Sequence, residues 1–219
     1  AAPLAICYTS GTTGRPKGAV LSHAQLIGAA ETIVATVDYR LHDVSLIATP
    51  LFHVGGLSFA TLFTARGASA VVPAAWVSGE ILDAISRYRV NHFFAVPAML
   101  DALLGAMPPS VDCSSLRWIM TGAAPLPARL IARYHERGVP LLQSYGATET
   151  AGPGTCVDAE HVLAKPGSIG KPFFHTEVRV VKSDGSIALP NERGELQVRG
   201  AHVFSGYWNN PEASREALV

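Results

Sequence analysis

An eleven-residue run near the start of the chain combines glycines, hydroxyl groups and a cation at short spacing. It follows a short apolar stretch, Ala5 to Tyr8, and reads Tyr-Thr-Ser-Gly-Thr-Thr-Gly-Arg-Pro-Lys-Gly over residues 8–18. Glycines let backbone N–H groups approach an anion closely, and Lys17 supplies positive charge. The run therefore predicts a loop that binds a polyphosphate. It differs from the common P-loop, because Lys17 follows proline and Gly18 stands in place of Ser or Thr.

Two later segments place small or polar residues after predicted strands. Residues 121–125, Thr-Gly-Ala-Ala-Pro, follow the strand Trp118 to Met120, and Thr148 and Glu149 come shortly after the strand Leu141 to Gln143. Parallel sheets bind their ligands at the carboxyl ends of their strands. The small residues would let a flat base approach the backbone, although an ordinary turn between a strand and a helix has a similar composition.

The predicted strands and helices that must position these segments alternate along the chain. Such repeated strand–helix–strand units predict the α/β class, with a mainly parallel sheet flanked by helices. Serine and proline mark three helix starts, at Ser22, Ser78 and Pro97. The predicted strands are 45–49, 70–72, 92–96, 118–120 and 141–143, and the predicted helices are 22–37, 57–65, 78–88, a short one from 97, and 127–137 closed by Gly138.

The pattern changes after about Gly152. Glu177 to Val181 and Glu195 to Arg199 are predicted strands with turn signals between them and no helix. We therefore expect two parts: an α/β subdomain at 1–152 that binds nucleotide and acid, and a small β-rich, barrel-like region at 153–219. Pro211 to Leu218 has the pattern of a helix start without a stop signal, so we expect the chain to be a fragment.

Composition excludes several classes of protein. With 48% hydrophobic and 16% charged residues the chain is expected to be globular rather than disordered. Lysine plus arginine and aspartate plus glutamate number 17 each, and no basic run points to nucleic acid. Cys7, Cys113 and Cys156 are too scattered for a disulfide framework or a zinc site, which favours a cytoplasmic protein.

One uncharged stretch, Val44 to Ala65, is long enough to cross a bilayer. Pro50 and the pair Gly55-Gly56 interrupt it, so it is better explained by a strand, a loop and a helix. We expect no transmembrane segment, and peripheral contact with a membrane stays open.

Five segments in order resemble the motifs of the adenylate-forming (AMP-binding) superfamily, and most closely its acyl-CoA synthetase or fatty-acid–CoA ligase branch. They cover nearly the whole chain, which would be a fragment of the family's large N-terminal domain. The segments are 8–18, the acid-pocket segment 50–57, the adenine-side loop 121–126, the Tyr-Gly-x-Thr-Glu segment 143–150, and Gly-Glu-Leu-x-x-Arg-Gly at 194–200 with its continuation to 213.

The resemblance implies a role for each segment. Lys17, Thr148 and Glu149 would be catalytic, with Glu149 holding Mg²⁺, which prefers carboxylate and phosphate oxygens. The nucleotide would be bound by Thr9, Ser10, Gly11, Thr12, Thr13, Gly14, Lys17, Gly122, Ala123, Ala124, Pro125, Ser144, Tyr145, Gly146 and Thr148. The acid pocket would contain His53, Val54, Gly55, Gly56, Val96, Met99 and Ala147.

The implied reaction is ATP-dependent acid–CoA ligation. A carboxylic acid and ATP would give acyl-AMP and pyrophosphate, and CoA would then take the acyl group as a thioester. Amino-acid-activating relatives carry Phe-Asp where this chain has Phe52-His53, so an α-amino acid is disfavoured. His53 would border the pocket without acting as a general base, because a carboxylate needs no deprotonation to attack phosphorus.

The sequence leaves alternatives open for the identity of the acid and for the class of protein. The small, apolar pocket candidates favour a medium- or long-chain fatty acid, with an aryl acid of the coumarate type as the alternative. A luciferase-like enzyme shares all five motifs, and a nucleotide-binding module without turnover is the non-enzyme alternative. The family's ribose-binding aspartate and mobile C-terminal lysine have no counterpart here, so we expect residues 1–219 alone to be inactive. Lys171 to His175 departs from the family's usual Pro-Gly turn.

Overall fold

The computed structural model describes residues 2–10 and 15–219. Within these residues the largest sheet has seven strands in the order β4-β3-β5-β6-β7-β8-β9. The strands from β4 to β7 run parallel, and β8 and β9 continue the sheet in antiparallel pairing. The bounds are β3 Val44–Leu46, β4 Ser69–Val71, β5 His92–Phe94, β6 Trp118–Thr121, β7 Leu141–Tyr145, β8 Thr155–Val157 and β9 Lys171–Pro172.

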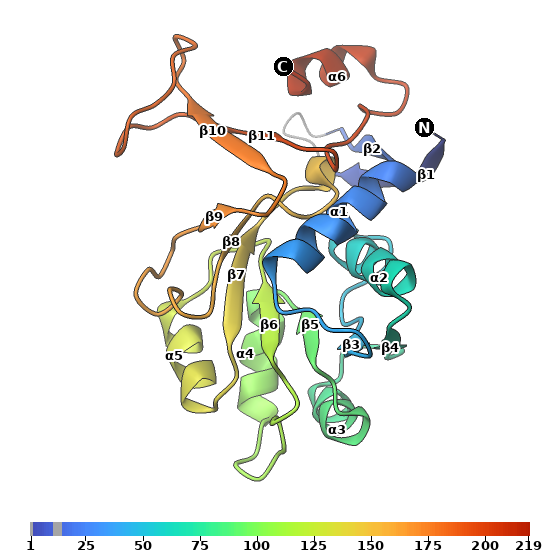
Figure 1. Cartoon of the computed structure of the whole chain (residues 1–219), viewed down its shortest axis with the longest axis vertical. Coiled ribbons are helices and arrows are strands. Elements are labelled where there is room, and N and C mark those ends of the chain that lie inside the picture. Colours follow the sequence, from blue (N-terminus) through green and yellow to red (C-terminus); the bar gives the residue numbers. More distant parts are fainter. Residues whose placement is uncertain (1, 11–14) are drawn as a thin grey trace.

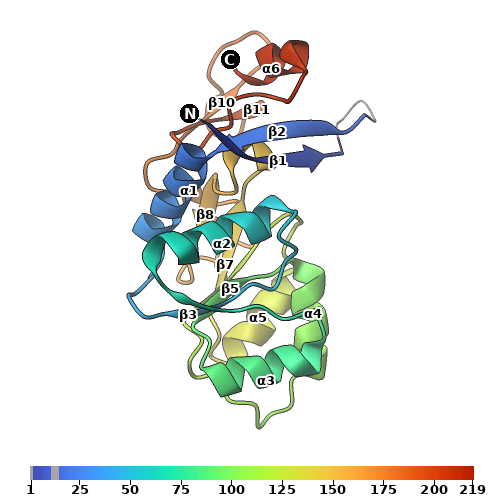
Figure 2. The same cartoon turned by 90° about the vertical axis from the view of Figure 1, so that its right-hand side faces the viewer.

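Helices cover both faces of this sheet (Figures 1 and 2). Strand side chains alternate between faces, so Ile119 of β6 packs with α3, α4 and α5, whereas Trp118 and Met120 pack with α1 and α2. The prediction of a mainly parallel α/β sheet flanked by helices is confirmed. The helices are α1 His23–Thr36, α2 Val54–Arg66, α3 Ser78–Tyr88, α4 Pro97–Ala106, α5 Ala128–Glu136 and α6 Pro211–Ala217, with a 3₁₀ turn, η1, at Thr148–Thr150.

Two of the three predicted helix starts are confirmed. Ser22 caps α1: its Oγ accepts a hydrogen bond from the Gln25 backbone N–H at 3.3 Å, and the Gln25 side chain accepts one from the Ser22 N–H at 2.7 Å. Pro97 opens α4. The prediction for Ser78 was wrong, because Val77 is the N-cap of α3 and no side chain caps it. Ser78 is the first residue within the helix, so the residue before it occupies the N-cap position.

The uncharged stretch at 44–65 forms β3, a loop and most of α2, as predicted. Among the described residues, none of the helices has the length and apolar character needed to span a bilayer.

The described ends of the phosphate-loop candidate belong to two paired strands. Strands β1 (Pro3–Thr9) and β2 (Lys17–Ser22) pair antiparallel, with Thr9 opposite Lys17. Strand β2 was not predicted, because it begins at Lys17 inside the glycine-rich motif and ends at the residue that caps α1. Four of the predicted phosphate-binding residues, Gly11, Thr12, Thr13 and Gly14, lie outside the described residues.

The C-terminal part returns to this hairpin. Strands β10 (Glu177–Val181) and β11 (Glu195–Arg199) form an antiparallel pair with the bounds that the sequence predicts. The chain then runs beside β2, where the Val20 N–H donates to the Gly206 carbonyl at 2.9 Å and the Trp208 N–H to the Gly18 carbonyl at 2.7 Å. The predicted boundary at residue 152 lies between β7 and β8 of the main sheet, and the division into two subdomains stays a prediction. In both views α6 lies at the same end of the molecule as the hairpin.

A buried polar cluster lies at the amino ends of the strands, opposite the predicted ligand-binding edge. The Asp43 carboxylate accepts hydrogen bonds from Arg117 and from the Arg40 backbone N–H, and lies 3.3 Å from Nε2 of His92. The His92 ring stacks on Trp118 at 4.3 Å between centroids. Burial lowers the pKa of His92. Burial alone would raise the pKa of Asp43, but hydrogen bonds with His92 and Arg117 outweigh it and hold that pKa well below its usual range.

This cluster predicts a loss of stability in mild acid. Unfolded His92 takes up a proton near its ordinary pKa of about 6.5, whereas the buried ring resists protonation, so the unfolded state binds more protons as pH falls. The free energy of unfolding should fall between pH 7 and pH 5, with at most about 2 kcal/mol from this one histidine. Asp43 adds a further loss once pH falls below the ordinary pKa of a carboxyl group.

Denaturant unfolding at pH 7 and pH 5 measures the effect. His92→Gln should show a smaller pH-dependent loss than the unsubstituted protein, while His135→Gln, an exposed position on α5, should show the same loss. An unchanged difference between the two pH values in His92→Gln would remove His92 as its source.

Candidate active site

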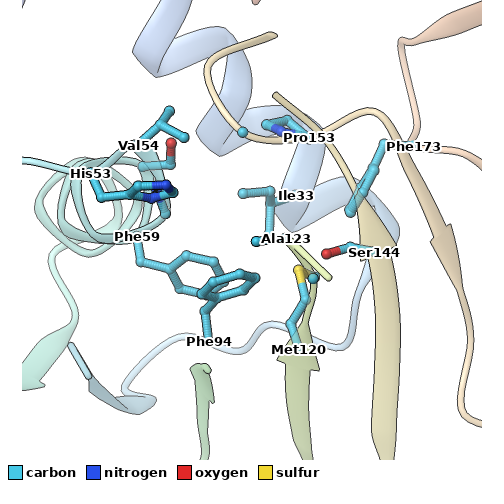
Figure 3. A pocket seen from close by; sticks show the side chains of 15 residues that line it. Ile33, His53, Val54, Phe59, Phe94, Met120, Ala123, Ser144, Pro153 and Phe173 are labelled. Carbon is cyan, nitrogen blue, oxygen red and sulfur yellow. Dashed lines mark hydrogen bonds between the residues drawn. The ribbon is translucent and has the colours of Figure 1, made fainter. Parts of the chain in front are cut away.

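A cavity opens where the carboxyl ends of β5, β6 and β7 meet α1 and α2 (Figure 3). The start of α2 gives it His53 and Val54, and side chains from the sheet and α1 enter from the other sides. It lies at the edge where a parallel sheet is expected to bind ligands. The lining consists of Ile33, His53, Val54, Gly55, Ser58, Phe59, Phe94, Met120, Gly122, Ala123, Ser144, Gly146, Gly152, Pro153 and Phe173.

The cavity brings together residues that the sequence assigned to two separate ligands. Three predicted acid-pocket residues, His53, Val54 and Gly55, share it with predicted nucleotide-side residues. Those are Gly122, Ala123, Ser144 and Gly146. A carboxylate bound on one side would therefore lie next to a nucleotide bound on the other.

Four predicted acid-pocket residues lie outside the lining. Val96 is the N-cap of α4, and Met99 packs against the core beneath that helix. Ala147 precedes η1, and Gly56 faces the loop before α2, where an added Cβ would lie 2.3 Å from the Pro50 carbonyl oxygen. Their role in acid binding therefore stays a prediction.

Several lining residues were missed by sequence analysis. Phe94 ends β5 and could have been found from its place at the carboxyl end of a predicted strand, and Phe59 lies about one helical turn after Gly55 on α2. Ile33 on α1 and Phe173 after β9 carry no local signal, because only the tertiary arrangement brings them here. The Phe59 and Phe94 ring centroids lie 5.8 Å apart, and together with Phe173 they give the cavity an aromatic lining.

His53 has a local structural contact at the rim. It is the N-cap of α2, and its Nδ1 accepts a hydrogen bond from the Gly55 backbone N–H at 3.1 Å. This contact satisfies one of the free donors at the helix start. The same histidine can therefore shape the acid side of the cavity without acting as a base.

On the predicted nucleotide side of the cavity, glycines let two backbone segments lie close to each other. A Cβ added to Gly146 would lie 1.5 Å from the Gly152 carbonyl oxygen, and one added to Gly122 would lie 2.8 Å from the Ser144 carbonyl oxygen. The Ser144 hydroxyl donates to the Thr121 carbonyl at 3.0 Å, and Ala123 takes a left-handed φ of 65°. The strand ends are thus shaped by small residues, which suits the approach of a flat base.

Glu149 lies in η1 and accepts hydrogen bonds from residues in the C-terminal part of the chain. Its Oε1 accepts a hydrogen bond from the Tyr207 hydroxyl at 2.6 Å, and its backbone carbonyl accepts one from the Phe204 N–H at 2.8 Å. Lys17, at the start of β2, places its Nζ 5.3 Å from the centre of the Tyr207 ring. Burial and the hydrogen bond with Glu149 raise the pKa of Tyr207, so the phenol stays a donor. Lys17 and Glu149 are therefore brought together around one tyrosine.

The described residues place one carboxylate, that of Glu149, near Lys17 and Tyr207. The part of the chain that the structure describes holds no group of three or more His, Cys, Asp and Glu side chains placed to hold a metal ion. Magnesium is usually held by one or two carboxylates together with water and substrate phosphates. Glu149, a single carboxylate on the tyrosine that Lys17 also contacts, matches that description.

Known proteins are similar to this chain in sequence and in fold. The family model described as "AMP-binding enzyme" matches residues 1–208. Feruloyl-CoA synthase of Amycolatopsis sp is 42% identical over 217 residues, covering 97% of this chain and 44% of that protein. Indoleacetate–CoA ligase of Aromatoleum aromaticum is 42% identical over 219 residues, covering 99% and 43%. Long-chain-fatty-acid–CoA ligase FadD13 of Mycobacterium tuberculosis is 36% identical over 217 residues, covering 98% and 43%.

Solved structures of similar proteins have the same fold. The N-terminal domain of FACL13 from Mycobacterium tuberculosis superposes with a TM-score of 0.91 at 33% identity, covering 100% of this chain and 56% of that chain. O-succinylbenzoate CoA synthetase from Bacillus subtilis, in complex with ATP and magnesium ion, gives a TM-score of 0.91 at 34% identity, covering 98% and 44%. The chain thus spans less than half the length of the curated relatives named above.

Proposed function

Because the chain belongs to the family of AMP-binding enzymes, we propose that it forms the nucleotide- and acid-binding part of an ATP-dependent acid–CoA ligase. The observation that carries the proposal is the shared cavity, which His53 and Gly55 line together with Gly122 and Ser144. The proposal concerns the complete protein that carries this chain, and residues 1–219 alone are not proposed to be sufficient.

The proposed reaction has two steps. In the first, a carboxylate oxygen of the acid attacks the α-phosphorus of ATP, and pyrophosphate leaves to give acyl-AMP. In the second, the thiol of CoA attacks the acyl carbon, AMP leaves with the bonding electrons, and the thiol proton is released. The protein's main contribution to the first step is to position both substrates and to neutralise charge.

Each part of the site has a proposed task in the first step. Gly122, Ala123, Ala124, Pro125 and Tyr145 bind the adenine side, and Thr148 donates a hydrogen bond to the α-phosphate. Lys17, with Thr9, Ser10 and the loop between them, binds the phosphates, and Glu149 holds magnesium. When bound, magnesium neutralises the phosphate charge that grows as pyrophosphate departs.

An aryl acid is the best-supported substrate class. Phe59, Phe94 and Phe173 line the apolar side of the cavity, and aromatic rings pair favourably with another ring at centroid distances of about 4.5–7 Å. The feruloyl-CoA synthase and the indoleacetate–CoA ligase described above, each 42% identical to this chain, are named for acids that contain aromatic rings. The medium- or long-chain fatty acid favoured by the sequence becomes the second candidate, supported by the 36% identical fatty-acid ligase.

Thioester formation separates these candidates. The complete protein should convert a hydroxycinnamate or an arylacetate to its CoA thioester, in the presence of ATP and magnesium, faster than it converts a C8 to C16 fatty acid. A preference for the fatty acids would reverse the assignment of the acid while leaving the ligase reaction intact.

Enlarging Gly55 should close part of the cavity. An added Cβ would already lie 3.2 Å from Cε1 of Phe94 and 3.4 Å from Nδ1 of His53, so a larger side chain must project into the space used by the acid. We expect Gly55→Trp to lower kcat/KM for a bulky aryl or long-chain acid by at least about tenfold, with a smaller loss for acetate or propionate.

Steady-state kinetics over an acid series checks this result, with Gly79→Trp as the control. Gly79 lies in the first turn of α3, and no atom lies within 4 Å of a Cβ added there. If Gly55→Trp retains its activity on the bulky acid, Gly55 does not border the bound acyl group.

A further inference from the structure

The segment from Phe204 to Trp208 joins the two halves of the proposed phosphate site. On one side its backbone pairs with β2, through Ser205 to the Val20 carbonyl at 3.2 Å and Trp208 to the Gly18 carbonyl at 2.7 Å. On the other side the Phe204 N–H donates to the Glu149 carbonyl at 2.8 Å. The segment therefore bridges the hairpin that carries Lys17 and the turn that carries Glu149.

Tyr207 is the side chain of this segment that reaches both groups. Its hydroxyl donates to Oε1 of Glu149 at 2.6 Å, and the Lys17 ammonium lies 5.3 Å from its ring centroid, which is within the range of a cation–π contact. Its own position is fixed, because its backbone N–H donates to Ser214 Oγ at 2.8 Å and its ring packs edge-on against Phe204 at 4.9 Å. The tyrosine is therefore held in place before it contacts either group.

We propose that Tyr207 is a positioning residue for acyl-adenylate formation, which holds the Glu149 carboxylate through its hydroxyl and the Lys17 ammonium through its ring. The inference rests on the proposed ligase function and assigns it a residue outside the predicted phosphate-binding and metal-binding motifs. Tyr207 contacts neither the acid nor the reacting phosphorus in this account; it acts through Glu149 and Lys17.

The two contacts have separable physical effects. A short hydrogen bond to Oε1 fixes the rotation of the carboxylate and leaves its second oxygen for magnesium. Among the described residues, Tyr207 provides the one side-chain hydrogen bond to that carboxylate. Without the hydroxyl, Glu149 must be ordered by the metal itself, so magnesium binds more weakly. The ring restricts Lys17 without neutralising it, which keeps its charge available for phosphate.

Two substitutions distinguish these effects. Tyr207→Phe removes the hydroxyl and keeps the ring, so the magnesium concentration for half-maximal pyrophosphate exchange should rise about tenfold, as expected for losing a hydrogen bond to a charged group. The KM for the acid should not change. Tyr207→Leu removes both contacts and should in addition raise the KM for ATP roughly threefold.

Tyr134→Phe is the matched control. The Tyr134 hydroxyl is buried and donates to the Leu100 carbonyl at 2.8 Å, on the opposite face of the sheet from the cavity. Its loss should lower the thermal unfolding midpoint and leave the magnesium dependence unchanged. A merely structural role for Tyr207 would give the same outcome as this control.

The test is a magnesium titration of pyrophosphate exchange in the complete protein, paired with calorimetric titration of ATP at low and high magnesium without acid. An active Tyr207→Phe variant with the magnesium dependence of the unsubstituted protein overturns this inference alone. Unsubstituted protein that shows neither exchange nor magnesium-supported ATP binding overturns the proposed function and this inference together. A shift in both assays for Tyr207→Phe, with none for Tyr134→Phe, supports the inference.

Discussion

Replacing Glu149 with alanine is expected to lower the rate of magnesium-supported acyl-adenylate formation by about 10²-fold, the usual loss when one electrostatic contact to a transition state is removed. The Glu149 carboxylate is held by Tyr207 and lies in the turn after β7, at the ligand-binding edge of the sheet. Its loss removes the proposed protein ligand of magnesium, and the departing pyrophosphate is then less well neutralised. The change should appear mainly in kcat at saturating ATP.

Two further variants, Glu149→Gln and Glu160→Ala, test whether the loss of activity comes from the negative charge at position 149. Glutamine keeps the size of the side chain and can still accept a hydrogen bond from Tyr207, but it lacks the charge, so a comparable loss assigns the effect to electrostatics. Glu160 is an exposed acidic residue in the turn after β8, and its replacement should have no effect. Activity of Glu149→Ala within twofold of the unsubstituted enzyme would exclude Glu149 from the site.

Replacing Gly146 with alanine is expected to have the second large effect. The new Cβ would lie 1.5 Å from the Gly152 carbonyl oxygen and 2.7 Å from its carbonyl carbon, and both obstacles are backbone atoms that cannot rotate away. The turn from β7 through η1 must therefore shift, and with it Thr148 and Glu149. We expect the free energy of unfolding to fall by about 3 kcal/mol, at the upper end of typical overpacking, and activity to fall by at least about 10²-fold.

Gly105→Ala provides the comparison for Gly146→Ala. Gly105 lies in α4, and a Cβ added there would meet no atom within 4 Å, so alanine should leave activity unchanged and raise stability by up to about 1 kcal/mol through its better helix propensity. Denaturant unfolding and the exchange assay measure both variants. A stable, active Gly146→Ala protein would show that this turn tolerates displacement and does not fix the catalytic residues.

Features with local signals could be predicted from the sequence. Ser22 and Pro97 mark helix starts because capping and the missing proline N–H depend on neighbouring residues alone. The same holds for β10 and β11, where alternating apolar residues lie between turn signals. Ser78 shows the limit of such signals, since both Val77 and Ser78 can precede the helix and only the backbone decides which is the cap.

Features that depend on contacts distant in sequence could not be predicted. Phe173 enters the cavity because β9 joins the edge of the main sheet, and no pattern near residue 173 indicates that pairing. The hydrogen bond between Tyr207 and Glu149 joins residues that are 58 positions apart. The Asp43–His92 contact is likewise formed when β3 and β5 become neighbours in the sheet. In each case the residue types are common ones, and only the fold brings them into contact.

The most direct test of the account is exchange of labelled pyrophosphate into ATP, catalysed by the complete protein and measured over a panel of carboxylic acids with and without magnesium. We expect exchange that requires both magnesium and an acid, and that is fastest with an aryl acid. ATP binding without exchange for any acid in the panel would contradict it, and would leave a nucleotide-binding module without turnover as the function of this chain.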